Sequence, residues 1–503
     1  LKTVCLLGLG LSGERARASK AAVQFGLRGT KKKKPADNAI ENLIDQNLLL
    51  YRRHADELSV WHGTDIDIRS RLEDEKARQR EAFDILDFLR KECPQPVWRP
   101  LEYNAQFGVR RFLRSEFHTV ESLQKWLDEL PKDDENKALP NDTDGIVCYV
   151  IPERAGDVKQ AEQIAKLQRW HRWLVVAIPR EFVPTADAAL EIRALAQLRA
   201  DNELISTDPL VLDELLQMDD DARKHLQRCL DSLLSPSPTG PRWFFYCDAN
   251  KKKVTEETQV DSPLRLRRHL SQMMRELYPK TPIVHNEMIV RRKPTAVIVN
   301  ARKKLLMGIL ERSGMPDMGI EGNFPAAAMF RSVLRNTGLY ADDGNGRFKF
   351  QEPEQIKDPG LRAVWSEVKV FFTEPCEEGK GVSEFLQKLK LPPFGVRDGF
   401  LPILFAAGLR AFPSATSLLR DGVYVRDILP SDIETVCKEP EQHRLVVLKL
   451  DEAKKKYLNE FLEIFRTSTS YTVAERDLIR MCFDALEAWR YQLPKAAFQS
   501  TGI

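Results

Sequence analysis

Three glycines near the start of the chain have the spacing of a dinucleotide-binding fingerprint. Gly8, Gly10 and Gly13 form a G-x-G-x-x-G pattern after an apolar run, and residues 14–25 can form the helix that should follow. In a strand–turn–helix unit such glycines permit a tight turn and a close approach to a pyrophosphate. The acidic residue expected about 20 positions later is absent, because the sequence there is RGTKKKK. The segment therefore has two interpretations, which are a dinucleotide site and an apolar helix that ends in a Gly/Ser turn.

Other catalytic patterns are missing from the sequence. The string nearest to a phosphate-binding loop, EEGKGV at residues 377–382, lacks the first glycine, the preceding strand and the hydroxyl that binds Mg²⁺. The eight histidines and eight cysteines are scattered, without a C-x-x-C pair, an H-E-x-x-H motif or a nucleophile elbow. We therefore predict no catalytic residue, no metal site and, the dinucleotide alternative aside, no cofactor in this chain.

Basic residues gather near the N-terminus and form a candidate nucleic-acid site. The first 34 residues contain nine Lys or Arg and one acidic residue, Glu14. Charges without base-reading side chains support contacts to phosphates only. The alternatives are a solvated loop, a wing that packs on a neighbouring domain and, near residue 111, a strand with one basic face. The residues predicted to contact nucleic acid are Lys31, Lys32, Lys33, Lys34, Arg52, Arg53, His54, Arg110 and Arg111.

A second polar group lies between apolar residues in the segment 283–302. Buried polar groups need hydrogen-bond partners whether or not a ligand is present. This group could therefore bridge a domain interface or line a ligand pocket. Its members are Asn286, Glu287, Arg291, Arg292 and Arg302.

The elements that would position the N-terminal basic residues follow from hydrophobic periodicity. Ile40, Leu43 and Ile44 have helical spacing, and the apolar runs 48–51 and 58–61 flank a polar turn. A helix followed by such a hairpin predicts a winged-helix-like unit.

Four passages resemble large P-loop ATPases of prokaryotic phage-defence operons, of the BREX type and related STAND-like or AAA+ proteins. They are YRRHADELSVWHGTDIDI (51–68), PIVHNEMIVRRKPTAVIVNARKKLL (282–306), residues 319–340, and FGVRDGFLPIL (394–404). The resemblance implies that this chain is the C-terminal, non-P-loop region of such a protein. Its role would be that of a non-catalytic sensor, an effector-coupling region or a DNA-binding region.

The same resemblance implies the partners. ATP and Mg²⁺ would bind only to an N-terminal core outside this chain, whose apolar start at Leu1 we interpret as a position inside a longer protein. Double-stranded DNA and other proteins of the defence operon are the expected partners, and the sequence allows an oligomer. A protein-binding scaffold without DNA contact is the alternative outside the enzyme class.

Composition predicts a soluble cytoplasmic protein. The 503 residues carry a net charge of +3, with 43% hydrophobic and 30% charged residues. No apolar run reaches the roughly 20 residues that a membrane span needs. Widely spaced cysteines are typical of reduced core thiols.

We predict an α+β, predominantly helical, multidomain fold. The apolar runs 143–151 and 173–178 flank a helical pattern at 157–170, which indicates a parallel βαβ unit. A helix, hairpin, helix and strand over residues 401–450 predict a second winged-helix-like unit, so that two such units flank the central α/β domain. The expected boundaries are 1–95, 96–250, 251–375 and 376–503.

Overall fold

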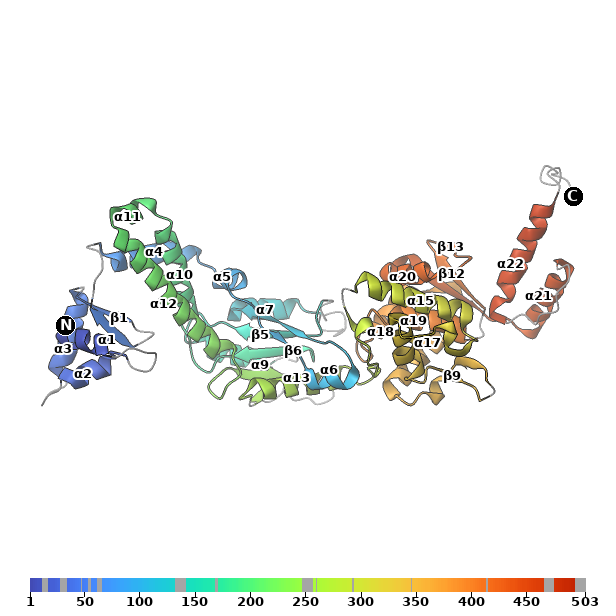
Figure 1. Cartoon of the computed structure of the whole chain (residues 1–503), viewed down its shortest axis with the longest axis horizontal. Coiled ribbons are helices and arrows are strands. Elements are labelled where there is room, and N and C mark those ends of the chain that lie inside the picture. Colours follow the sequence, from blue (N-terminus) through green and yellow to red (C-terminus); the bar gives the residue numbers. More distant parts are fainter. Residues whose placement is uncertain are drawn as a thin grey trace. The chain divides into compact units, whose positions relative to one another are not determined.

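The computed structural model is an α+β fold that is mostly helical, with several small sheets (Figure 1). This confirms the predicted fold class at that level. No helix in the part of the chain that is described is long and apolar enough to cross a membrane. The structure describes residues 1–10, 17–27, 34–46, 48–52, 56–60, 66–131, 142–167, 171–246, 257–258, 260–291, 294–344, 346–412, 415–465 and 475–493.

The chain divides into two compact units. The first unit contains Leu1–Trp98, Leu113–Lys132 and Gly145–Leu266, and the second contains the remaining segments, Arg99–Phe112, Asp133–Asp144 and Arg267–Ile503. The backbone therefore passes between the units at residues 98/99, 112/113, 132/133, 144/145 and 266/267. The predicted division into four domains is finer than this and stays a prediction.

The first unit begins with three short helices and a hairpin, which we together call the N-terminal unit. The elements are α1 (Lys2–Gly10), α2 (Lys20–Leu27), α3 (Lys34–Asp45), β1 (Leu49–Arg52) and β2 (Glu57–Val60). The two strands pair antiparallel, which confirms the predicted helix and hairpin. The helices and strands share a small core formed by Val4, Ala18, Val23, Ile40, Leu49 and Leu58.

The rest of the first unit is built on a six-stranded sheet with the order β3-β4-β5-β6-β7-β8. Its strands are β3 (Val97–Trp98), β4 (Leu113–His118), β5 (Ile146–Val150), β6 (Leu174–Ile178), β7 (Arg242–Phe245) and β8 (Glu257–Thr258). The middle strands β4, β5 and β6 are parallel, and the others join antiparallel. Every residue of β5 and β6 is buried, which explains their unbroken apolar sequence and confirms the βαβ prediction.

Helices connect the strands of the first unit. The crossover helices are α7 (Val120–Glu129) between β4 and β5, and α9 (Asp157–Leu167) between β5 and β6; the others are α4 (Ile68–Gln79), α5 (Ile85–Glu92), α10 (Thr185–Arg199), α11 (Asn202–Thr207) and α12 (Pro209–Leu234). Helices α4 and α5 are separate, because Asp84 accepts hydrogen bonds from the backbone N–H groups of Leu86 and Asp87 and thereby starts α5.

The second unit is a helical body with one hairpin and one four-stranded sheet. Its helices are α6 (Leu101–Phe107), α13 (Pro263–Leu277, whose first four residues are counted in the first unit), α14 (Glu287–Val290), α15 (Ala296–Arg312), α16 (Pro325–Phe330), α17 (Pro359–Thr373), α18 (Val382–Lys390), α19 (Leu401–Ala411), α20 (Pro430–Lys438), α21 (Glu452–Phe465) and α22 (Glu475–Gln492). The hairpin is β9 (Tyr340–Asp342) with β10 (Phe348–Phe350). Helix α19 is apolar on nearly all sides and is buried accordingly.

The four-stranded sheet has the order β11-β14-β12-β13, all antiparallel. Its strands are β11 (Cys376–Gly381), β12 (Ala415–Arg420), β13 (Val423–Tyr424) and β14 (His443–Leu448). Asp421 and Gly422 have φ values of 49° and 80°, as a tight hairpin turn requires, and β12 and β13 form the hairpin predicted within residues 401–450. The glycine- and lysine-containing string at 377–382 is mostly strand β11 and not a phosphate loop.

Gly108 closes α6 in the left-handed region, with a φ of 64°. A Cβ at this position would lie 2.6 Å from the Val284 carbonyl oxygen. We expect Gly108→Ala to lower the free energy of unfolding by about 2 kcal/mol, since strain and a clash with backbone combine. Urea unfolding measures this, with Gly314→Ala, which meets no atom within 4 Å, as the control. Equal stability of the two variants would contradict it.

Candidate functional site

The N-terminal hairpin is fastened to the start of α2 and to the residues just before it. Asp56 at the tip has a φ of 45°. Its Oδ1 accepts hydrogen bonds from the Tyr51 hydroxyl at 2.9 Å and from the Lys20 backbone N–H at 3.3 Å. The Leu58 N–H donates to the Ala18 carbonyl at 2.8 Å. The hairpin is therefore held against the helices rather than projecting alone.

Two of the predicted phosphate contacts near the N-terminus belong to described elements. Lys34 is the first residue of α3, and Arg52 is the last residue of β1. A basic residue that the sequence reasoning did not single out is Lys20, whose ammonium group lies 3.5 Å from Glu41 and 5.8 Å from the centre of the Tyr51 ring. The other predicted contacts lie outside the described residues: Lys31, Lys32, Lys33, Arg53 and His54.

The glycine fingerprint does not have the structural context of a dinucleotide site. Gly8 lies within helix α1 and Gly10 is its last residue, whereas the fingerprint needs a strand before the turn. Gly13 lies outside the described residues. The dinucleotide interpretation is therefore wrong for this segment, because the apolar run is a helix.

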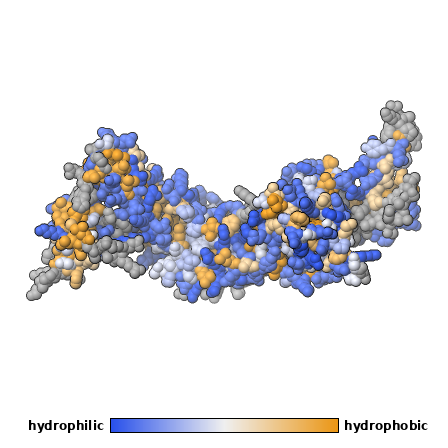
Figure 2. Space-filling view, viewed as in Figure 1, coloured by the Kyte–Doolittle hydropathy of each residue, from blue (hydrophilic) through white to orange (hydrophobic). Residues whose placement is uncertain are grey.

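The same N-terminal unit exposes large apolar side chains. Leu6, Leu9 and Phe25 are 70%, 80% and 80% exposed. Figure 2 shows apolar surface over this unit. An exposed apolar surface of this kind is compatible with packing on another protein.

Arg110 and Arg111 have opposite environments in the second unit. Arg110 is exposed and lies 3.1 Å from the Glu287 carboxylate. Arg111 is only 1% exposed, and its Nη1 donates to Asp144 Oδ1 at 2.7 Å. The prediction that Arg111 contacts a nucleic-acid backbone is therefore wrong, because its charge is buried in an ion pair.

Arg111 belongs to a buried polar cluster, which we call the Arg111–Asp144–Arg397 cluster. Arg397 Nη2 donates to both Asp144 oxygens at 2.9 and 3.1 Å. Burial alone would raise the pKa of Asp144, but Arg397 and Arg111 outweigh it and hold that pKa below its usual value. Asp144 is thus ionised at neutral pH.

Neutral groups complete the cluster around Arg111. Its guanidinium carbon lies 3.6 Å from the centre of the Tyr278 ring, and its Nη2 donates to the Thr281 hydroxyl and the Gly395 carbonyl at 3.2 and 3.0 Å. The Tyr103 hydroxyl donates to Thr281 at 2.8 Å. These contacts join segments that are far apart in the sequence, so the cluster stabilises the second unit.

The polar group predicted at 286–302 forms separate contacts within the second unit. Asn286 accepts from the Met288 N–H at 2.8 Å, which starts α14, and donates to Ser332 at 2.6 Å. Glu287 is exposed, and its carboxylate lies 4.0 Å from Arg291. Arg292 lies outside the described residues.

Arg302 is the buried member of that group. Its Nε and Nη2 donate to the two carboxylate oxygens of Glu434 at 2.6 and 2.7 Å. Both side chains are 8% exposed. The pair joins α15 to α20 inside the core, which makes it a structural contact between elements.

A line of polar side chains lies at the carboxyl end of β4, where parallel sheets commonly hold their sites. The carboxylate of Glu116 lies 3.3 Å from His118 Nε2, and the Ser122 hydroxyl lies 3.5 Å from His118 Nδ1. The hydrogen bond from His118 lowers the pKa of Glu116 despite partial burial, and Arg114 lowers it further. The alternation E-x-H along a strand could have revealed this pair from the sequence.

This line has the residue types of a nucleophilic relay, but its geometry favours a structural role. The Ser122 hydroxyl also lies 3.2 Å from the Thr119 carbonyl, as at many helix starts. His118 is buried and packs at 5.3 Å from the Trp126 ring. We therefore assign Glu116, His118 and Ser122 a structural role at the connection between β4 and α7.

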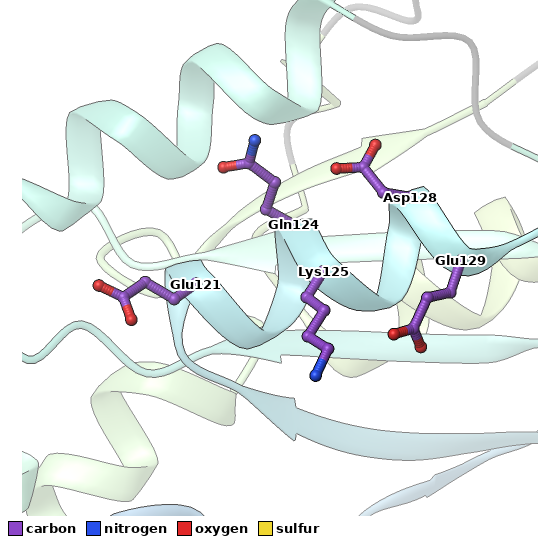
Figure 3. Close-up of a pocket in the computed structure, with 5 residues that line it drawn as sticks. All are labelled: Glu121, Gln124, Lys125, Asp128 and Glu129. Carbon is purple, nitrogen blue, oxygen red and sulfur yellow. The ribbon is translucent and has the colours of Figure 1, made fainter.

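A surface cavity of about 470 Å³ lies along α7 (Figure 3). Its lining comes entirely from that helix: Glu121, Gln124, Lys125, Asp128 and Glu129. Figure 3 shows Gln124 and Asp128 on one side of the helix and Lys125 and Glu129 on the other. The side chains diverge, so they do not form a binding constellation.

Comparisons with known proteins do not identify the chain: no family model, curated protein or solved structure matches it. Within the described ranges, no group of three His, Cys, Asp or Glu residues could hold a metal ion. The resemblance to phage-defence ATPases therefore remains an expectation from the sequence.

Proposed function

We propose that the chain is a non-catalytic region of an ATP-dependent, BREX-like anti-phage defence protein, and that its N-terminal unit binds the backbone of duplex DNA. The observation that supports this most is the arrangement of α1, α2, α3 and the β1–β2 hairpin on one small core. Three helices followed by a hairpin are the elements of a winged-helix domain, a helix-turn-helix variant. The nine basic residues among the first 34 add the charge that phosphate contacts require.

A second winged-helix-like unit is part of the proposal. Helix α19, the β12–β13 hairpin, α20 and β14 follow one another in the expected order, with β11 added to the sheet. In this proposal the second winged-helix-like unit contacts other proteins of the defence operon in the cytoplasm. ATP and Mg²⁺ belong to a core outside this chain.

Coupling between parts is supported by the path of the backbone. The chain passes between the two compact units five times, at the residues given above. A displacement of one unit therefore acts on the other through five covalent connections. This connectivity suits a region that transmits the state of an ATPase core.

DNA binding can be tested by fluorescence anisotropy with a labelled duplex at two salt concentrations. If six side chains contact phosphates, the dissociation constant should rise about 10³-fold between about 50 and 200 mM salt. Glutamine in place of six basic residues should weaken binding at low salt. It should also reduce the slope of the logarithm of the dissociation constant against the logarithm of the salt concentration by about 5. The positions to change are Lys31, Lys32, Lys33, Lys34, Arg52 and Arg53.

A matched control removes the same number of charges from exposed lysines of the second unit and should leave DNA binding within about twofold. Those positions are Lys303, Lys304, Lys349, Lys357, Lys438 and Lys454. No binding at low salt, or equal losses in both variants, would contradict the proposed DNA contact. It would favour a scaffold whose N-terminal unit binds protein.

A further inference from the structure

The Arg111–Asp144–Arg397 cluster has one more positive than negative charge. Arg111 and Asp144 are 1% and 4% exposed at the side chain, and Arg397 is 19% exposed. Asp398, the next acidic residue along the chain, is 73% exposed and pairs with Lys390 at 2.8 Å. It therefore does not neutralise the buried charge.

Both arginines also keep a buried donor without an acceptor. The Nε atoms of Arg111 and Arg397 are buried and make no hydrogen bond to any of the described residues. Buried N–H groups in native proteins almost always have a partner, so each Nε is a donor that a small acceptor could use. Burial lowers the pKa of Arg397, and the charge of Arg111 adds to this, although Asp144 opposes it. An added negative charge would relieve this cost.

A small cavity lies beside Arg397. Its volume of about 20 Å³ is enough for one water-sized particle and too small for a phosphate or an organic carboxylate. Arg397, Thr281 and Gly395 line it together with apolar side chains such as Val109 and Phe400. Apolar walls strengthen the attraction between a cation and an anion, because they exclude water.

We propose that this cavity is a binding site for one small monovalent anion of the size of chloride, held by Arg397 within the second unit. The anion neutralises the excess charge of the cluster. It thereby stabilises the segments that supply Arg111, Thr281 and Arg397. The site is independent of the proposed DNA contact.

The proposal is tested by thermal unfolding of the full chain in sodium chloride and in sodium gluconate at equal ionic strength, since gluconate is too large for the cavity. A ligand that binds only the folded state raises the unfolding midpoint. We expect a chloride-specific rise of about 5 °C at a concentration 100 times the dissociation constant. Equal midpoints in the two salts would overturn the proposal and assign the cavity to water.

The Arg397→Met variant separates this site from general salt effects. Asp144 then faces Arg111 alone, the excess charge is gone, and the chloride-specific rise should disappear. The exposed Lys388→Met is the matched control and should keep the full rise. A rise that persists in Arg397→Met would overturn the assignment to this cavity.

A direct measurement covers the case in which Arg397→Met does not fold. The ³⁵Cl NMR line of chloride should broaden in the presence of the unchanged chain and narrow when bromide competes. Absence of broadening beyond that caused by an equal concentration of heat-unfolded chain would also overturn the proposal.

Discussion

Replacement of Asp144 by asparagine should lower the free energy of unfolding by about 3–5 kcal/mol at neutral pH. The reason is that removal of one partner from a buried ion pair leaves an uncompensated charge. Here two guanidinium groups, Arg111 and Arg397, lose their shared carboxylate at once. Asparagine keeps the size of the side chain, so the effect of charge is isolated from that of a cavity. Urea unfolding followed by circular dichroism measures the change.

The matched control is Asp398→Asn, which removes an exposed carboxylate from the same loop. Exposed ion pairs contribute about 0–1 kcal/mol, so this variant should remain close to the unchanged chain. If both variants lose the same free energy of unfolding, the ion pairs of the buried cluster do not stabilise the fold as we propose.

The pH dependence of this effect has a definite sign. The two arginines hold the folded-state pKa of Asp144 below its unfolded value of about 3.9. The stabilisation is therefore complete above that value and is lost as the pH falls through the folded-state pKa. The difference in unfolding free energy between the unchanged chain and Asp144→Asn should be full at pH about 7 and should shrink as the pH falls below the unfolded-state pKa of about 3.9. A constant difference would contradict this.

The parts of the fold that the sequence predicts well are those with unmistakable local patterns. Strands β5 and β6 are apolar at every position because both faces of the sheet are covered. The turn at Asp421 and Gly422 uses residue types that tolerate positive φ. Each of these patterns is complete within about ten residues.

Strands β4 and β11 were harder to predict because their sequences, LRSEFH and CEEGKG, are polar. Strand β4 alternates buried and half-buried residues. Strand β11 is held by pairing with β14, more than 60 residues later in the chain. Tertiary pairing thus overrides local propensity at both positions.

The burial of Arg111 could not be read from its neighbours. Its partners come from distant segments: Asp144 is 33 residues away, and the Gly395 carbonyl is 284 residues away. The local string FGVRRFLRSEF contains one carboxylate, Glu116, and this carboxylate pairs with Arg114 at 2.8 Å. The adjacent Arg110 has the same charge and is exposed, so the sequence alone cannot separate a surface contact from a core ion pair.

The buried pair Arg302–Glu434 should show strong coupling in a double-mutant cycle. Arg302→Met leaves the Glu434 carboxylate buried without its bidentate partner, and should lower the free energy of unfolding by about 3–5 kcal/mol. Glu434→Leu should cost about the same, because it leaves the guanidinium unpaired. The double variant should lie within about 1 kcal/mol of the unchanged chain, since two apolar side chains pack without a desolvated charge.

The exposed pair Lys369–Glu352, at 2.8 Å, is the control cycle in the same unit. Its single variants Lys369→Met and Glu352→Leu should each change stability by less than about 1 kcal/mol, with little coupling. Additive losses at Arg302 and Glu434 would mean that each side chain contributes by separate packing. Strong coupling there, with none at Lys369 and Glu352, would instead show that burial gives the pair its energy, because the two cycles compare the same charges at different exposure.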